Sequence, residues 1–280
     1  MPLEVLKLLI GRAKILEKPL GIQPNPRAQK SLPIAILFCF PERVLAIAAH
    51  PDDIEWLCGG TLALCAKRGD EIIIAIATNG NVGSGEPGAK KDEIARIRHE
   101  EAKTSAAVIG AKVIWMDFDD EFLFDDRPTR ERFIDAIREA RPDIMFVLSE
   151  TDYHPDHRLA GSIARDCRIP VSVPLVQTKL PETPIPTTFI MDTIMGKGFE
   201  PEFYVDVTSV MDIKDKMLSS HVSQVAWTEH MYSIGFTENM YVQARFRGVQ
   251  GGFKYGEGFR LMQDWPSTGG YELLPTGKSK

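Results

Sequence analysis

The chain has 280 residues, of which 44% are hydrophobic and 26% charged, as in an ordinary globular protein. Its formal net charge of -6 disfavours nucleic acid and anionic membranes as partners, because no overall basic field attracts them. The spacing of the four cysteines excludes a disulfide framework and is typical of reduced thiols in a cytoplasmic protein.

Residues 1–41 are predicted to form an arm that precedes the main domain. Residues 3–16 have the pattern of an amphipathic helix, and a proline-containing loop and an apolar stretch at 32–40 follow. A signal peptide would need a longer uncharged core, and a bilayer-spanning helix needs about 20 apolar residues. We therefore predict a cytoplasmic protein without a transmembrane segment. The arm could pack on its own core or on a neighbouring subunit of a homo-oligomer.

After the arm, apolar runs alternate with segments of helical periodicity. The apolar runs, which suit strands buried on both faces, lie at 44–49, 71–77, 113–116 and 144–148. Three helical segments lie between them. The first ends near Arg68, before the capping glycine Gly69, and the other two span 92–109 and 129–140. Beyond residue 170 the alternation breaks, leaving β-like pieces at 189–194 and 204–207 and a last helix from about 208 to 220.

Alternating strands and helices of this kind form right-handed βαβ units with parallel strands. We therefore predict an α/β, Rossmann-like three-layer fold in which helices cover both faces of a mostly parallel sheet. Residues 42–280 would form this single domain. The strand ends matter for function, because ligands bind beyond the carboxyl ends of the strands in open parallel sheets.

The first chemical motif is His50-Pro51-Asp52-Asp53, directly after the first strand. His50 and Asp53 stand three residues apart, so a turn can point both side chains at one cation while Asp52 points elsewhere in the pocket. Two adjacent carboxylates beside a cation favour a division of labour, in which one coordinates and the other accepts a proton.

The second motif is His154-Pro155-Asp156-His157, in the loop after the strand at 144–148. Asp156 could orient His154, because a neutral histidine needs a partner that fixes its tautomer. Either motif alone could be a turn with a capping aspartate. Two such clusters at strand ends of one βαβ chain favour a metal site, and together they offer three ligands and the open position that catalytic zinc requires.

Other chemistries find little support in the sequence. The chain has neither a G-x-S-x-G elbow nor a Walker motif. The loop at 79–85 is rich in glycine, but its glycines do not have the spacing of a dinucleotide-binding fingerprint.

In this order, the two motifs resemble the LmbE-like family of N-deacetylases, also called the PIG-L family. The resemblance spans roughly 43–261 and includes four further patterns: Cys58-Gly-Gly-Thr61, Arg98-x-x-Glu101, Arg141-Pro-Asp143 and His221-x-Ser223-Gln224. Many members have a glutamate after the paired aspartates, whereas this chain has Ile54 there and Glu55 next.

The resemblance implies a metal-dependent N-deacetylase, a hydrolase of linear amide C–N bonds that uses Zn²⁺ or another divalent transition metal. Its substrate would be a small N-acetylated amino sugar of the N-acetylglucosamine type, or a conjugate of one. The metal ligands would be His50, Asp53 and His157. An amidase acting on a non-sugar amide or thiol conjugate, and a metal-binding scaffold without turnover, are the alternatives.

The resemblance also implies roles for four other residues. Asp52 would be the general base, and His154 would stabilise the oxyanion with support from Asp156. Arg98 would be a candidate contact for the substrate.

Overall fold

The computed structural model describes residues 41–232 and 235–266. All but the last residue of the predicted arm therefore lies outside the described residues, and the arm and its boundary stay predictions. No helix in the described part of the chain is long and apolar enough to cross a membrane.

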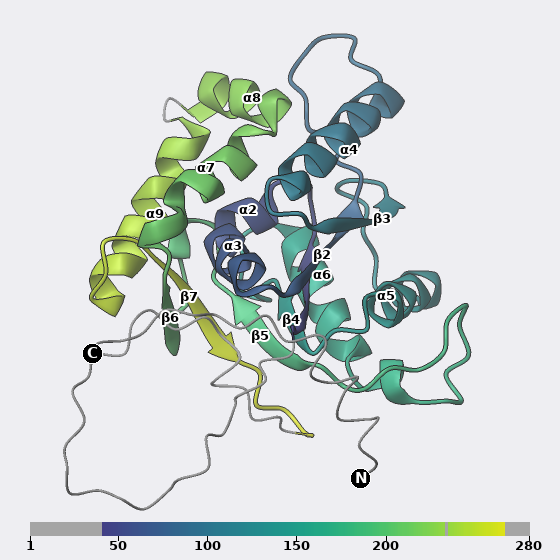
Figure 1. The fold of residues 1–280 in the computed structure, drawn as a ribbon. Helices are drawn as coiled ribbons and strands as arrows, with labels where there is room; N and C mark the ends of the chain where they lie inside the picture. The colour runs from purple at the N-terminus through teal and green to yellow at the C-terminus, as the bar shows by residue number, and fades with distance from the viewer. Residues whose placement is uncertain (1–40, 233–234, 267–280) are drawn as a thin grey trace, which may run out of the picture. The chain divides into compact units, whose positions relative to one another are not determined.

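Seven strands within these residues form one sheet, in the order β3-β2-β1-β4-β5-β7-β6 (Figure 1). The first five are parallel: β1 (Arg43–Ala48), β2 (Glu71–Thr78), β3 (Lys112–Phe118), β4 (Ile144–Val147) and β5 (Thr187–Met191). The last two are β6 (Phe203–Asp206) and β7 (Gly256–Leu261), and β7 is antiparallel to both β5 and β6. The predicted mostly parallel sheet is confirmed.

Helices cover both faces of the sheet, as predicted (Figure 1). One layer consists of six helices that pack on one another: α2 (Asp53–Leu57), α3 (Gly59–Arg68), α4 (Lys91–Ala107), α7 (Met211–Ser219), α8 (Val222–Tyr232) and α9 (Phe236–Gly251). The other layer holds α5 (Arg127–Ala140) and α6 (Pro155–Cys167). The two groups of helices lie on opposite faces because the chain crosses the sheet in opposite directions. The connections through α3 and α4 run from β1 to β3, whereas those through α5 and α6 run from β3 back to β4 and on to β5.

Two expectations about the helices were wrong. The helix expected from about 208 to 220 is a 3-10 turn at Thr208–Val210 followed by α7, and it is not the last, since α8 and α9 follow. The second motif was expected in a loop, but His154 is the N-cap of α6 and Pro155 occupies its first turn. The sequence of α9 does not show the single apolar face that predicts a helix, because α9 exposes Val242 and Phe246 and buries Arg247.

A buried ion pair fastens β7 to the first helical layer. The Glu257 carboxylate accepts hydrogen bonds from the Gly60 and Thr61 backbone amides at 2.9 and 2.7 Å, and it pairs with Lys214 Nζ. The amides belong to the first turn of α3, where the helix dipole favours negative charge. A Cβ on Gly60 would lie 2.7 Å from the Val207 side chain, so the contact requires glycine.

We expect Glu257→Gln to destabilise the fold by about 3–5 kcal/mol, because it leaves the Lys214 ammonium buried without its counter-charge. Urea unfolding followed by circular dichroism measures the change. Glu100→Gln is the matched control, since the Glu100–Lys103 pair is exposed on α4 and its loss should leave the midpoint unchanged. Equal midpoints for the two variants would contradict the prediction.

Candidate metal centre

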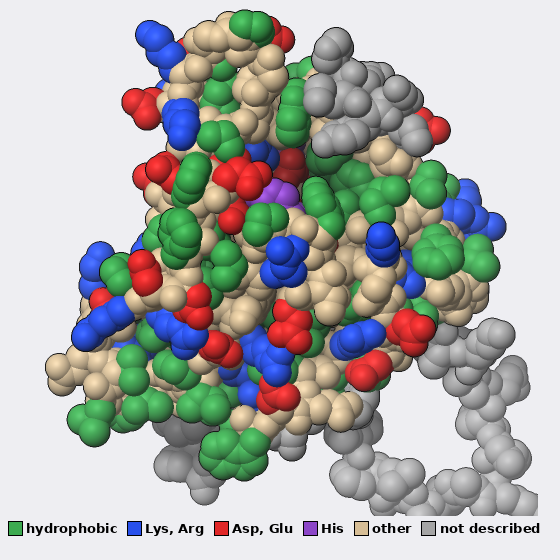
Figure 2. All heavy atoms as spheres, turned by 180° about the vertical axis from the view of Figure 1, so that it is seen from behind, with side chains coloured by type: hydrophobic (Ala, Val, Ile, Leu, Met, Phe, Trp, Pro, Cys, Tyr) green, Lys and Arg blue, Asp and Glu red, His purple; other side chains and the backbone are tan. Residues whose placement is uncertain are grey.

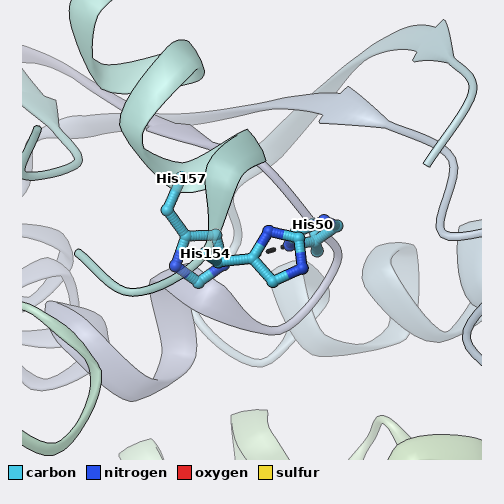
Figure 3. A group of neighbouring side chains, drawn as sticks. All are labelled: His50, His154 and His157. Atoms are coloured by element: carbon cyan, nitrogen blue, oxygen red, sulfur yellow. Dashed lines mark hydrogen bonds between the residues drawn. The ribbon is translucent and has the colours of Figure 1, made fainter. Parts of the chain in front are cut away.

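The two sequence motifs meet at the carboxyl edge of the sheet. His50 follows β1, His154 and His157 lie at the start of α6 after β4, and β1 pairs directly with β4. Figure 3 shows the three imidazoles gathered at this edge, with His50 and His157 joined by a dashed contact. In the space-filling view, a histidine surface lies at the bottom of a hollow (Figure 2).

Three predicted ligand atoms converge on one point. His50 Nδ1 lies 3.1 Å from His157 Nε2, which in turn lies 3.1 Å from Asp53 Oδ1. The other Asp53 oxygen, Oδ2, accepts hydrogen bonds from the backbone amides of Ala49 and His50 at 2.9 and 2.8 Å. The turn therefore fixes the Asp53 carboxylate and leaves Oδ1 directed at the histidines.

Carboxylates face the outer nitrogens of both histidines. His50 Nε2 lies 3.0 Å from Asp120 Oδ1 and 3.5 Å from Asp156 Oδ2, and His157 Nδ1 lies 3.0 Å from Asp152 Oδ1. An outer N–H directed at a carboxylate leaves the inner nitrogen of a neutral imidazole with a lone pair. Two lone pairs and a carboxylate oxygen then face one another, and this donor set fits a divalent transition-metal cation.

Without a cation, the surrounding carboxylates favour the protonated forms of His50 and His157. Burial lowers the pKa of His157, but the Asp53 and Asp152 carboxylates outweigh burial and raise it to about 9. Burial likewise opposes protonation of His50, whose pKa Asp120, Asp156 and Asp53 nevertheless hold well above its ordinary value. The carboxylates of the site thus stabilise positive charge, whether on the two histidines or on a bound cation.

The Asp52 carboxylate faces Arg98. Asp52 has a φ of 123°, which few residues other than glycine adopt, and this turn sends Asp52 and Asp53 in different directions. Arg98 Nη2 lies 3.2 Å from Asp52 Oδ2 and donates to the Pro51 carbonyl at 2.6 Å. Burial and the nearby Asp53 raise the pKa of Asp52, against the opposing charge of Arg98, to about 6.

Arg98, the predicted substrate contact, is buried against the protein itself. Its guanidinium faces Asp52 and Pro51, and Cβ atoms on Gly80 or Gly83 would lie 2.5–2.6 Å from its Nη1. Gly80 and Gly83 of the loop after β2 therefore make room for Arg98.

His154 lies beside the cluster with both nitrogens engaged. Its Nδ1 accepts a hydrogen bond from the Asp156 backbone amide at 3.2 Å, and its Nε2 lies 3.1 Å from Glu121 Oε1. The Asp156 amide, rather than its carboxylate, thus supports His154. The carboxylate instead faces His50 and accepts from the Glu121 amide at 2.8 Å.

Sequence reasoning missed three residues of the site: Asp120, Glu121 and Asp152. Asp120 and Glu121 follow the carboxyl end of β3, which is the same edge of the sheet that carries both motifs. That position was a usable signal, because acidic residues after a parallel strand end are candidates for a site. Asp152 stands two residues before His154, and nothing in its spacing marks it as the partner of His157.

The same part of the chain matches a family model and several named proteins. Residues 45–168 match the PIG-L family, described as GlcNAc-PI de-N-acetylase. The chain is 28% identical over 79% of its length to a diacetylchitobiose deacetylase from Thermococcus kodakarensis, of which the match covers 83%. It is also 28% identical over 67% of its length to a 4-oxalmesaconate hydratase from Pseudomonas putida, of which the match covers 74%.

A solved structure has the same fold. The N,N'-diacetylchitobiose deacetylase from Pyrococcus horikoshii superposes with a TM-score of 0.70 at 28% identity, over 79% of this chain and 84% of that one. The matched segment begins in β1 and ends one residue after α6, so it contains both histidine motifs. Residues 45–168 of this chain therefore form a PIG-L (LmbE-like) family domain.

Proposed function

We propose that the protein is a zinc-dependent hydrolase that removes the acetyl group from an N-acetylated amino sugar or its conjugate. The observation that carries this proposal is the convergence of His50 Nδ1, His157 Nε2 and Asp53 Oδ1 beside the separate carboxylate of Asp52. The deacetylase names of two similar proteins support the reaction and the N-acetylglucosamine type of substrate.

We assign His50, Asp53 and His157 as the zinc ligands. By distance alone, His154 could share a cation with the other two histidines. Its Nδ1 lone pair, however, already accepts from the Asp156 amide, and its Nε2 faces Glu121. Asp53 Oδ1 has no such competing role, and a carboxylate better offsets the charge of the cation.

We propose the following roles for the remaining side chains. When bound, zinc would polarise the acetyl carbonyl and make water a stronger acid. Asp52, which Arg98 keeps partly ionised, accepts the proton of the attacking water. His154 would donate from Nε2 to the carbonyl oxygen as it gains negative charge, in place of the contact of that nitrogen with Glu121. Either Asp52 or His154 returns a proton to the departing amine.

In this scheme Arg98 acts through Asp52, whose carboxylate its guanidinium positions, and direct contact with the sugar stays a prediction. The cytoplasmic location stays a proposal too, with support from the free, buried thiols of Cys58, Cys65 and Cys167. Self-association through the arm is likewise still a prediction.

The direct test is amine release from N-acetylglucosamine, diacetylchitobiose and an N-acetylglucosaminyl-inositol, detected with fluorescamine. We expect release that a chelator abolishes and added Zn²⁺ restores. Simple N-acylated amines and thiol conjugates test the amidase alternative, and 4-oxalmesaconate tests for the chemistry of the hydratase relative. Turnover of either group, with none of the sugars, would refute the proposal.

We expect Asp52→Asn to lower kcat by about 10²–10⁴-fold, because an amide cannot accept the proton. Metal content, measured by mass spectrometry after dialysis, should stay at the wild-type level. Asp53→Asn is the matched control on the next residue, and it should lose metal as well as activity. Near-normal turnover of Asp52→Asn would disprove the assignment of the base.

We also expect metal affinity to rise with pH between 6 and 8. Because the pKa of His157 is about 9 in the metal-free protein, a cation must displace a proton throughout this range. Competition with a chromophoric chelator should show about a tenfold gain per pH unit for each displaced proton. Asp152→Asn removes a carboxylate that raises this pKa, so its slope should be shallower. A flat wild-type profile would contradict the prediction.

A further inference from the structure

The His221-x-Ser223-Gln224 motif has no part in the chemistry described so far. It lies where α7 ends and α8 begins, and the His221 carbonyl accepts hydrogen bonds from the amides of Gln224 and Val225 in the first turn of α8. The His221 and Gln224 side chains are buried, although both are polar. Burying polar groups is costly unless they have partners, so their partners indicate what the motif does.

His221 contacts the helix that follows the predicted general base. Its Nε2 lies 3.1 Å from Oε1 of Glu55, which stands three residues after Asp52 in the first turn of α2. The same Glu55 oxygen accepts a hydrogen bond from the Ser105 hydroxyl of α4. Burial lowers the pKa of His221, but the charges of Glu55 and Asp52 outweigh burial and raise it. The imidazole therefore fixes α2 and lies within electrostatic reach of Asp52.

Ser223 contacts the helix that carries Arg98. Its amide and its hydroxyl donate to the two carboxylate oxygens of Glu101, each at 2.7 Å. Glu101 stands three residues after Arg98 on α4, so the two side chains share one side of that helix. The paired hydrogen bonds hold this side of α4 against the start of α8.

Gln224 contacts the loop that encloses Arg98. Its Nε2 donates to the Gly83 carbonyl at 2.9 Å. Gly80 and Gly83 are the residues whose missing side chains make room for Arg98, and Arg98 Nη1 donates to the Gly80 carbonyl at 3.5 Å. Gln224 therefore holds in place the loop against which the guanidinium lies.

We propose that this motif is a positioning device for the general base: it holds the three segments that surround Arg98 and so fixes the direction of the Asp52 carboxylate. The inference rests on the proposed function, in which Asp52 accepts the proton of water. Asp52 needs support because its φ of 123° persists only where surrounding contacts enforce it. The metal ligands have support of their own, since the amides of Ala49 and His50 hold Asp53.

The test is a double-mutant cycle with Asp52→Asn, on the sugar that wild-type protein deacetylates. His221→Gln and Gln224→Met should each lower kcat about 10–100-fold, because a misplaced base slows proton transfer. KM and metal content should stay at the wild-type level. In the Asp52→Asn background the same substitutions should change the residual rate less than about twofold, because no base is left to misplace.

Two further substitutions separate the contact from the stability of α8. Ser223→Thr keeps the hydroxyl that binds Glu101 and should keep the wild-type kcat, whereas Ser223→Ala should lower it. Thr228→Val is the matched control, because Thr228 is buried on α8 but its hydroxyl donates to the Gln224 carbonyl of its own helix at 2.7 Å. This variant should keep the wild-type kcat. Urea unfolding shows which variants are folded, and if His221→Gln is not, the Ser223 and Gln224 variants decide.

The possible failures differ in what they overturn. Losses that multiply with that of Asp52→Asn overturn the positioning role and leave the proposed function intact, because they act independently of the base. Loss of metal from the single variants also overturns that role, since the motif would then support the metal centre. No release of amine from any of the sugars by wild-type protein overturns the proposed function, and the positioning role with it.

Discussion

The approach of His50 Nδ1 to His157 Nε2, 3.1 Å apart at the edge of the sheet, is the constraint on which the site depends. Two nitrogen lone pairs at that distance repel unless a proton or a cation lies between them. The pairing of β1 with β4 brings the backbones together. The outer nitrogen of His157 is hydrogen-bonded to Asp152, and the outer nitrogen of His50 lies 3.0 Å from Asp120 Oδ1. The affinity for positive charge is therefore a property of the fold, and Asp53 completes it with an oxygen.

Concentrating carboxylates in a buried site carries an electrostatic cost, and their arrangement shows how it is offset. Asp53, Asp120, Asp152 and Asp156 each face a histidine nitrogen or a backbone amide. Asp52 instead faces the guanidinium of Arg98. This separates the carboxylates that stabilise bound charge from the one able to exchange a proton. Burial raises the pKa of Asp52, against the opposing charge of Arg98, to about 6, near neutrality.

The sequence predicted the sheet and the two motifs because both depend on local pattern. Buried strands such as 71–77 are unbroken apolar runs, and the motif residues are dense and follow those runs. Asp152 and Glu121 could not be assigned partners, because their contacts depend on how separate loops fold over the strand ends. α8 and α9 were missed for a different reason: their apolar residues do not follow one face. The buried Lys214–Glu257 pair joins two charged residues 43 positions apart, which no spacing rule identifies.

Stability and chemistry constrain the buried centre together. Changing a ligand or its carboxylate partner would strand a buried charge, so those positions are constrained by stability as well as by chemistry. The same carboxylates also fix the neighbouring loops, because the Glu121 amide donates to Asp156 Oδ2 and the Ile194 amide donates to Asp152 Oδ2. The contacts that orient the histidines therefore also position the chain segments beside them, and this couples the shape of the site to its geometry for a cation.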